Sequence, residues 1–335
     1  MAYINSIGFI SPQNTSDNGF ACDISHEGEK TLRCVEPDYG KLINPVQLRR
    51  MSHILKLGIG AAQICLNGAG NVRPDAIVVG TGLACVIDLE TFLVAVLEEN
   101  GQRLSPIPFI NSSHNTVASQ IARILKNRSY NNTYCHRGSA FESALTDAVM
   151  LAGEGRSNVL VGGVDEISRQ YVSLLNSMNI PVATGEGAGF FLVGDSPSAG
   201  SYARIGGVRT AFFPAPDLRQ TGGFILDFLA DSGLSLADID TVVLGKNGYR
   251  ADDMIYDCLA EELFPADRQL ISYKHLCGEY MTSTAFALAL SAHALKFGAF
   301  PKSCYAAGTE ARKPQRILVF NHYLQKNYSL MIVER

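Results

Sequence analysis

Apolar residues along this chain gather in short runs, and each run has the length of a single strand. The runs richest in Val, Ile and Leu span residues 76–79, 159–161, 190–193, 241–244, 317–320 and 330–333. Continuous apolar runs of this kind are typical of strands that are buried on both faces. Helical spacing of apolar positions is found between them, notably at residues 53–66, 139–152, 222–232 and 284–297. Strands that alternate with helices predict an α/β fold with parallel strand pairings.

The order of these elements suggests an internal duplication. Residues 75–82 and 240–247 each begin with Asp, continue as an apolar strand and end in a Gly-led turn, and residues 139–153 and 284–298 form a second matching pair in the same order. Ser, Pro and Gly cluster between the two copies. We therefore predict an N-terminal half at residues 1–198 and a C-terminal half at residues 199–335. Because any two strand–turn–helix units look alike, the repeat taken alone leaves a chance match open.

Composition and charge narrow the possible partners. A chain of 335 residues, 47% of them hydrophobic, can bury a large core. The formal net charge is −4 and the pI is about 6.0, and no basic stripe is available to follow a phosphate backbone, so we expect no nucleic-acid partner. The longest apolar stretch with helical character, residues 282–300, contains His293 and Lys296 and falls short of a membrane span. The N-terminus shows no basic leader followed by an apolar core, so we expect a cytoplasmic protein without a membrane segment.

The cysteines show no metal-binding pattern. They contain no CxxC pair and no other ligand spacing, and they lie at positions 22, 34, 65, 85, 135, 258, 277 and 304. In a reducing compartment, most of them are expected to be free thiols packed as small hydrophobic side chains. At most one or two should take part in chemistry, and we expect no metal.

A glycine-rich stretch at residues 185–189 raises the possibility of a nucleotide site. A dinucleotide fingerprint needs a strand before the glycines and a helix after them. Here the apolar strand comes afterwards, at residues 190–193, and Pro181 lies before the glycines. The order of the elements therefore argues against nucleotide binding.

Several segments of the chain have counterparts, in the same order, in one known family. The glycines at residues 185–189 with the strand that follows give the most specific match. The other matching segments lie at residues 49–52, 80–82, 111–122, 133–138 and 161–166. Together they resemble the β-ketoacyl-acyl carrier protein synthases of the thiolase superfamily. The resemblance implies an α/β thiolase-like fold, with two pseudo-symmetric halves in a five-layer α/β/α/β/α arrangement.

The resemblance also implies a chemistry. Members of the family serve fatty-acid or polyketide-type biosynthesis, and their acyl groups arrive on the phosphopantetheine of an acyl carrier protein, so no other cofactor is expected. Cys135 matches the nucleophile of the family, and Gly138 would allow a tight turn after it. A Cys between a strand and a helix is favoured because the helix N-terminus stabilises a thiolate. The alternative is a buried structural cysteine.

Both histidine positions of the family are altered in this chain. The family uses two neutral histidines to stabilise the enolate that forms when a malonyl thioester loses its carboxylate. Lys246 falls at the first position, and Glu279 replaces the second, after the retained Lys274 and Gly278. An ionised carboxylate only accepts hydrogen bonds and would repel both the malonyl carboxylate and the enolate. The candidate catalytic residues are therefore Cys135, Lys246, Lys274 and Glu279, and we expect Glu279 to pair with Lys246 or Lys274.

Two further departures concern the same region. The family's glycine-rich loop, which gates the acyl pocket, corresponds to residues 321–329, and these lack its glycines and with them part of the oxyanion hole. His136 and His275 lie close to the altered positions but are offset from them. Since neighbouring residues point in different directions, we expect neither histidine to be catalytic.

Three functions remain open from the sequence. The first is a non-condensing partner resembling a chain-length factor, as in aryl polyene-like pathways. The second is an acyltransferase or 3-oxoacyl-carrier protein synthase that uses Cys135 with a variant Lys and Glu site. The third is a cysteine hydrolase, supported only by the adjacency of His136 to Cys135. The resemblance implies an acyl carrier protein as partner, and either a homodimer or a heterodimer with an active ketosynthase, paired through the strand at residues 158–162 or the one before Cys135.

Overall fold

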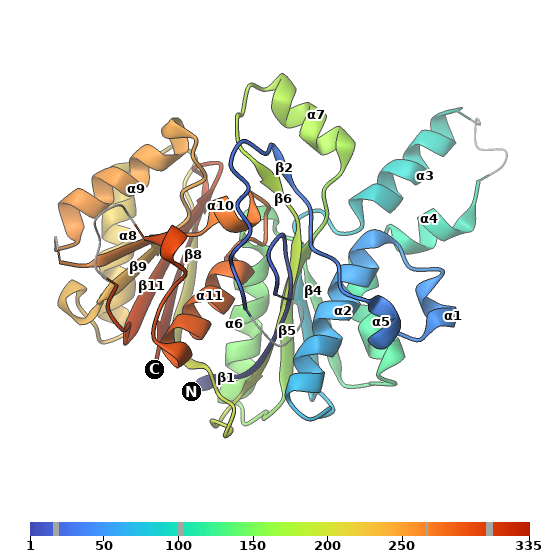
Figure 1. Cartoon of the computed structure of the whole chain (residues 1–335), viewed down its shortest axis with the longest axis horizontal. Helices are drawn as coiled ribbons and strands as arrows, with labels where there is room; N and C mark the ends of the chain where they lie inside the picture. Colours follow the sequence, from blue (N-terminus) through green and yellow to red (C-terminus); the bar gives the residue numbers. More distant parts are fainter. Residues whose placement is uncertain (16–19, 99–103, 266, 306–310) are drawn as a thin grey trace.

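The computed structural model describes residues 1–15, 20–98, 104–265, 267–305 and 311–335. In these residues a 10-stranded sheet runs through the molecule in the order β10-β9-β11-β12-β8-β1-β7-β5-β3-β4 (Figure 1). Its strands are β1 (Ala2–Ile10), β3 (Ala76–Gly80), β4 (Tyr130–Tyr134), β5 (Val159–Asp165), β7 (Gly187–Gly194), β8 (Ala203–Phe212), β9 (Thr241–Leu244), β10 (Gln269–Ser272), β11 (Arg316–Tyr323) and β12 (Asn327–Glu334). Two short strands, β2 (Thr31–Leu32) and β6 (Thr184–Gly185), pair in parallel beside it.

The helices differ in length and in burial. The longer ones are α2 (His53–Gly68), α3 (Val86–Glu98), α5 (Thr116–Ile124), α6 (Ala140–Gly153), α7 (Arg169–Ser177), α8 (Leu218–Asp231), α9 (Arg250–Leu263) and α11 (Thr284–Phe297). The shorter ones are α1 (Pro45–Leu48), α4 (Pro106–Asn111), α10 (Lys274–Cys277) and the 3₁₀ turns η1 (Tyr39–Lys41), η2 (Arg137–Ser139), η3 (Leu236–Asp238) and η4 (Lys302–Cys304). The mixture of strands and helices confirms the α/β expectation.

The strand order repeats once along the sheet. One half reads β1-β7-β5-β3-β4 and the other β8-β12-β11-β9-β10, so that in each half the first strand pairs with the fifth and the fifth with the fourth. The pairings follow the same sequence of antiparallel, antiparallel, parallel and parallel in both halves. The halves meet where β1 and β8 pair antiparallel. The proposed division at residues 198 and 199 lies in the connection between β7 and β8.

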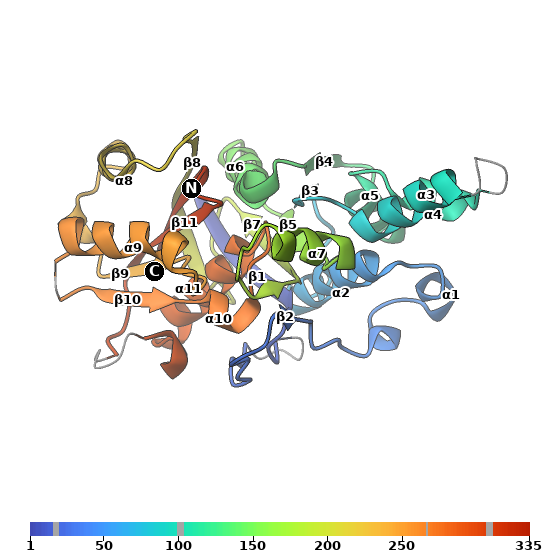
Figure 2. The ribbon, with the colours of Figure 1, turned by 90° about the horizontal axis from the view of Figure 1, so that it is seen from above.

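Apolar side chains pack in three core clusters, a central one around α6 and α11 and an outer one in each half. Within β3, Val78 belongs to a central core with α6 and α11, whereas Val79 belongs to an outer core with α2 and α5. Within β9, Val243 faces the same central core, and Val242 faces an outer core with α8 and α9. Side chains alternate between the faces of a strand, so a strand covered on both faces is apolar at every position. Figures 1 and 2 show α8 and α9 at one end, α2 and α5 toward the other, and α6 and α11 between them.

The apolar stretch at residues 282–300 is explained by this arrangement. It contains α11, the central helix, which buries most of its side chains between the two halves. A helix that is apolar all round needs either a core or a membrane around it, and here the core surrounds it. Among the helices in the described ranges, none is both long enough and apolar enough to cross a membrane.

Helices α3 and α4 project from the N-terminal half as an arm (Figures 1 and 2). Neither is packed into the core, since α3 buries no side chain and α4 buries only Asn111. The base of the arm is held by Glu166, which is 8% exposed and follows β5. Its carboxylate accepts hydrogen bonds from the backbone N–H of Ile54 at 3.2 Å and of Ile87 at 3.1 Å. One acid thus joins the N-terminal turns of α2 and α3, where helix dipoles favour negative charge.

One of the two strands that the sequence offered for pairing with another subunit is excluded. The strand at residues 158–162 became β5, which lies between β7 and β3 and has both edges occupied. Among the described residues, the strand before Cys135 is β4, which pairs with β3 alone and lies at one end of the sheet, with β10 at the other end. Of the two predicted strands, β4 is therefore the one with an open edge.

Candidate functional site

Cys135 lies in the turn between β4 and α6, as the sequence predicts, but its surroundings do not activate it. Its thiol donates a hydrogen bond to the carbonyl of Gly82 at 3.4 Å. Burial raises the pKa of Cys135, and the nearby Asp165 carboxylate raises it further. A reactive cysteine needs the opposite environment, in which a positive charge or helix N-terminus favours the thiolate. Cys135 is therefore a neutral thiol near neutral pH.

Asp165 connects the Cys135 turn to the C-terminal half. One carboxylate oxygen accepts from the backbone N–H of Gly82 at 2.7 Å and from the Thr81 hydroxyl at 3.2 Å. The other accepts from the backbone N–H and the hydroxyl of Thr282, both at 2.8 Å. Burial raises the pKa of Asp165, and these four hydrogen bonds oppose the rise. Asp165 is the last residue of β5 and lies within the matched segment at residues 161–166, yet sequence reasoning did not single it out.

The glycines at residues 185–189 allow two backbones to approach each other closely. A Cβ on Gly185 would lie 1.9 Å from the carbonyl oxygen of Cys277, and Gly278, at φ +76°, packs against Gly185 from the other side. The backbone N–H of Gly185 donates to the Glu279 carbonyl at 2.9 Å. The motif therefore positions residues 277–279, and the glycines run directly into strand β7, where a dinucleotide fingerprint would have a helix.

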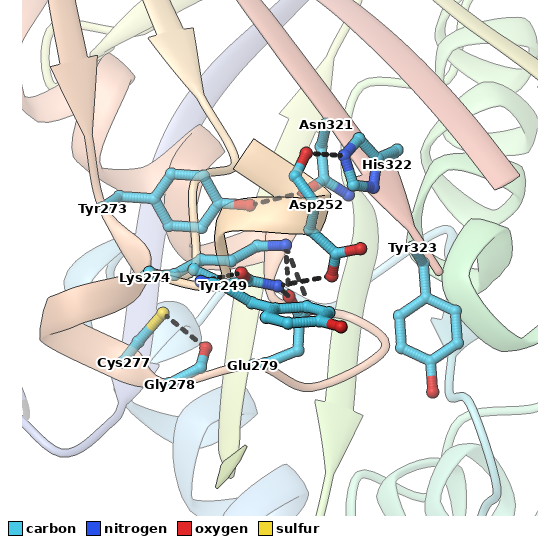
Figure 3. Close-up of polar contacts among 12 residues, drawn as sticks. Tyr249, Asp252, Tyr273, Lys274, Cys277, Gly278, Glu279, Asn321, His322 and Tyr323 are labelled. Carbon is cyan, nitrogen blue, oxygen red and sulfur yellow. Dashed lines mark hydrogen bonds and ion pairs between the residues drawn. The ribbon is translucent and has the colours of Figure 1, made fainter. Parts of the chain in front are cut away.

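Lys274 and Glu279 form a buried ion pair where the second histidine was expected (Figure 3). The Lys274 ammonium lies 2.7 Å from one Glu279 carboxylate oxygen and 3.0 Å from the other, and only 1% of the Lys274 side chain is exposed. Burial raises the pKa of Glu279, and the Lys274 charge opposes that rise. The expected pairing of Glu279 with Lys274 is thus present.

Lys246 does not join this pair, although it was a candidate. It points away and forms an ion pair with Asp257 on α9. The next residue, Asn247, takes the place near Glu279: its side-chain amide donates to Glu279 and to Asp252, each at 3.0 Å. Successive side chains of an extended segment point to opposite sides, so a shift of one residue exchanges the inner and outer positions. Asn247 is therefore a second site residue that sequence reasoning missed.

The expected gating loop is a regular hairpin in this chain. Strands β11 and β12 pair over their full length, and Leu324 and Gln325 make the turn, each with a φ of +52°. His322 is buried, stacks on Tyr256 with ring centres 4.6 Å apart, and has a ring nitrogen 3.0 Å from the Asp252 carbonyl oxygen. Burial lowers the pKa of His322 to about 4, so this histidine stays neutral and structural.

Tyr323 closes the site beside Cys135. A Cβ on Gly138 would lie 2.3 Å from the Cβ of Tyr323, which shows how closely the tyrosine packs on the turn after Cys135. Figure 3 shows the Tyr323 ring turned away from the Lys274 and Glu279 pair. Its hydroxyl lies 2.5 Å from the hydroxyl of Tyr171 on α7.

The two offset histidines lie outside the site. His136 is exposed and bonds to Ser143 at 3.0 Å, and His275 is exposed. Among the described residues, no histidine ring is hydrogen-bonded to Cys135, so the geometry of a cysteine hydrolase is missing there. In the same residues, no group of three or more His, Cys, Asp or Glu side chains is arranged to hold a metal ion.

Little space is left between the two halves of the site. A cavity lined by Tyr171, Glu279 and Met281 has a volume of about 20 Å³. That volume admits about one water molecule. An acyl chain does not fit there in this conformation.

Comparisons with known proteins agree with the fold and with the family that the sequence motifs resemble. The family described as "Beta-ketoacyl synthase, N-terminal domain" matches residues 29–188. No curated protein matches the chain. Among solved structures, the ishigamide ketosynthase/chain length factor has a TM-score of 0.80 at 16% identity, covering 99% of this chain and 98% of its own.

Two other solved structures are complexes. The type II polyketide ketosynthase AntDE, bound to the acyl carrier protein AntF, has a TM-score of 0.74 at 15% identity, with 99% of each chain covered. The ketosynthase ApeO with its chain length factor ApeC, from Xenorhabdus doucetiae, has a TM-score of 0.73 at 15% identity, covering 99% of this chain and 97% of its own.

These matches to solved structures show that the chain has the α/β thiolase-like fold over its whole length. The family match over residues 29–188 agrees with the resemblance that the sequence motifs suggested, so this part of the chain is similar to the N-terminal domain of β-ketoacyl synthases.

Proposed function

We propose that this protein is a non-condensing subunit that pairs with an active ketosynthase, in the manner of a chain-length factor. The buried ion pair of Lys274 and Glu279 is the observation that carries the proposal. Decarboxylative condensation develops negative charge on an enolate oxygen, and neutral donors must face that oxygen. Here a carboxylate lies at one histidine position, and Asn247 beside it is already bonded to Glu279 and Asp252.

The state of Cys135 supports the same proposal. Its pKa is raised by burial and by Asp165, and in the described ranges the thiol is hydrogen-bonded to the Gly82 carbonyl and to no ammonium or imidazole. A condensing enzyme first needs a thiolate to accept the acyl group. Both observations support a protein with the fold of a synthase but without the charges that acylation of the cysteine and decarboxylation would need.

The edge strand and the arm provide a surface for a partner. β4 carries no charged residue, and its outer edge offers unpaired backbone groups, which favours pairing with another strand. The neighbouring arm exposes large apolar side chains, namely Leu93, Leu97, Ile107, Phe109 and Ile110. An apolar patch of this kind on a projecting arm is typical of a protein interface. A partner of the same fold would extend the sheet across the interface and cover both arms.

Solved relatives motivate the choice of partner. ApeO is in complex with its chain length factor, and AntDE with an acyl carrier protein. For this chain we propose a ketosynthase as the subunit partner and an acyl carrier protein as the partner of the assembled pair.

Co-expression with a ketosynthase from the same genome tests the proposal. We expect a one-to-one complex by size-exclusion chromatography, and β-ketoacyl product from acyl- and malonyl-carrier protein only when the ketosynthase is present. Phe109→Glu on the arm should weaken the complex, whereas Phe212→Glu, exposed at the end of β8, should not. Product made by this chain alone, or homodimers only beside the ketosynthase, would contradict the proposal.

A second function is favoured by one observation, the partial exposure of Cys135 at the turn before α6. A thiol in this place could hold an acyl group without decarboxylating anything. Incubation with acyl-carrier protein followed by intact-mass measurement tests this function. An adduct that disappears in Cys135→Ser would support it, and an unmodified wild-type chain would exclude it.

A further inference from the structure

A larger cavity lies away from Cys135, where the two halves of the sheet separate. Strand β8 pairs with β1 only from Ala2 to Ile4, although β1 continues to Ile10. The backbone N–H of Tyr202 donates to the Ile4 carbonyl at 2.8 Å, at the point where the two strands part. Beyond it, a cavity of about 380 Å³ lies between β1, the end of α2 and the end of α11.

Helix α11 reaches from the candidate site to this cavity. It begins just after Thr282, which donates to Asp165 in the site. His293 and Lys296 line the cavity and lie about 13–18 Å further along the helix axis from Thr284, at 1.5 Å per residue. The cavity is therefore separate from the place where the chemistry of the family is expected.

Aromatic rings form one continuous wall of the cavity. The centre of the Phe20 ring lies 5.9 Å from that of Phe9 and 5.5 Å from that of His293. The His293 ring lies 6.4 Å from the Tyr202 ring. Burial lowers the pKa of His293 to about 4, and the Lys296 charge adds to this effect, so the imidazole is neutral near neutral pH. Such a wall favours a planar ring packed against it, offset or edge to face.

Lys296 brings a positive charge to the outer end of the cavity. Its side chain is exposed, whereas Phe9 on the inner wall is 1% exposed. The Lys296 ammonium donates to the Gly200 carbonyl at 2.5 Å and lies 3.8 Å from the centre of the Tyr202 ring. Among the described residues that line the cavity, Lys296 is the one with a charge. Since an ammonium has three donors, it can still donate to a ligand.

The other polar side chains of the lining are occupied within the protein. They belong to Asn5, Ser6 and Thr15. Ser6 donates to a backbone carbonyl of α2 at 2.7 Å, and the Thr15 hydroxyl lies 3.0 Å from a neighbouring hydroxyl. The Asn5 side chain accepts from the backbone N–H of Ser198 at 3.0 Å, in the connection between β7 and β8. The ammonium and the aromatic wall are therefore the groups that a ligand would meet.

We propose that this cavity binds a small aromatic carboxylate, with its carboxylate on Lys296 and its ring against His293 and Phe20. One ammonium matches one negative charge at the exposed end, and the rings inside match an aromatic body. A volume of about 380 Å³ is near the lower end of the range for small-molecule pockets, which suits a ligand of one or two rings. The site is a property of this chain alone and does not depend on the proposed pairing with a ketosynthase.

Fluorescence anisotropy of indole-3-acetate tests the site, because the chain has no tryptophan to interfere with the indole signal. We expect saturable binding to the wild-type chain. Lys296→Met should weaken it about 2- to 10-fold, the range set by the net contribution of one hydrogen bond. Lys326→Met, in the turn between β11 and β12, is the matched control and should bind like the wild type. The absence of saturable binding to the wild-type chain would overturn the proposal.

Indole-3-acetamide, used as a competitor, separates the charge from the ring. It should bind the wild type more weakly than indole-3-acetate by the factor that Lys296→Met costs, and its own affinity should not change in Lys296→Met. His293→Ala should weaken both ligands about 2- to 10-fold, through the lost ring contact. Equal affinity of the acid and the amide would overturn the carboxylate assignment. Binding unchanged in both variants would place the ligand elsewhere, and the exposed Lys296 allows this test even if His293→Ala does not fold.

Discussion

Replacing Lys274 with methionine should destabilise the protein strongly, because Glu279 would lose its partner inside the core. The ammonium lies 2.7 Å from the Glu279 carboxylate, and the two side chains are 1% and 11% exposed. Removing one member of a buried pair typically costs about 3–5 kcal/mol, since a buried charge is left uncompensated. For 335 residues the unfolding entropy is about 0.7 kcal/mol/K, so the melting temperature should fall by about 4–7 °C.

Two further variants separate charge from packing in that measurement. Lys246→Met removes an ion pair whose members are 29% and 56% exposed, and exposed pairs contribute about 0–1 kcal/mol, so its melting temperature should fall by less than about 2 °C. Lys274→Met combined with Glu279→Leu should recover most of the loss, because neither charge remains. Differential scanning calorimetry at neutral pH measures all three. Equal losses for Lys274→Met and Lys246→Met would refute the assignment of Lys274 and Glu279 as the buried pair.

Three other predictions follow from the contacts of single residues. Burial raises the pKa of Glu166 from its ordinary 4.5 to about 7. Between these two pH values the folded chain holds a proton that the unfolded chain has released, so the stability of the fold decreases as the pH rises from 4.5 to about 7. The melting temperature of Glu166→Gln relative to wild type should therefore increase between pH 5 and pH 8, by an amount equivalent to about 3 kcal/mol, and a constant difference would contradict the shift. Gly185→Ala should cost more than about 3 kcal/mol, because its Cβ would meet a backbone oxygen at 1.9 Å, whereas Gly153→Ala, with nothing within 4 Å, should be neutral in the same calorimetry. Iodoacetamide should label Cys135 more slowly than a free thiol at pH 7.5 and faster with each rise toward pH 9, since its pKa is raised, and a pH-independent rate would argue against this.

Much of the fold could be predicted from apolar runs because its strands are covered on both faces. β9 and α11 begin and end at the predicted residues, and the predicted runs at residues 76–79 and 317–320 became β3 and β11. The pattern failed where one side of an element is open. The edge strand β4 reads Tyr-Asn-Asn-Thr-Tyr, and its first two residues are exposed, so it carries no apolar signal. The arm helices α3 and α4 are apolar without being buried, so their pattern predicts a core that is not there.

The site was predictable only where a motif fixes the backbone. Gly278 is held against Gly185, so the position of Glu279 followed from its glycine. The turn after β9 has no such anchor, and a displacement of one residue exchanged Lys246 for Asn247. Asp165 was missed because its partners, Thr81 and Thr282, come from opposite halves of the chain, and no spacing in the sequence records such a contact.

The altered residues depend on one another. Glu279 is satisfied by Lys274 and by Asn247, and Asn247 in turn bridges to Asp252, whose carbonyl oxygen lies against the ring of His322. Returning Glu279 alone to histidine would leave the Lys274 ammonium without a counter-charge in the core and Asn247 without one of its acceptors, and the hairpin would still lack the glycines of the family's loop. A network coupled in this way resists single reversions. The physical cost of each isolated change therefore supports the proposed non-condensing role.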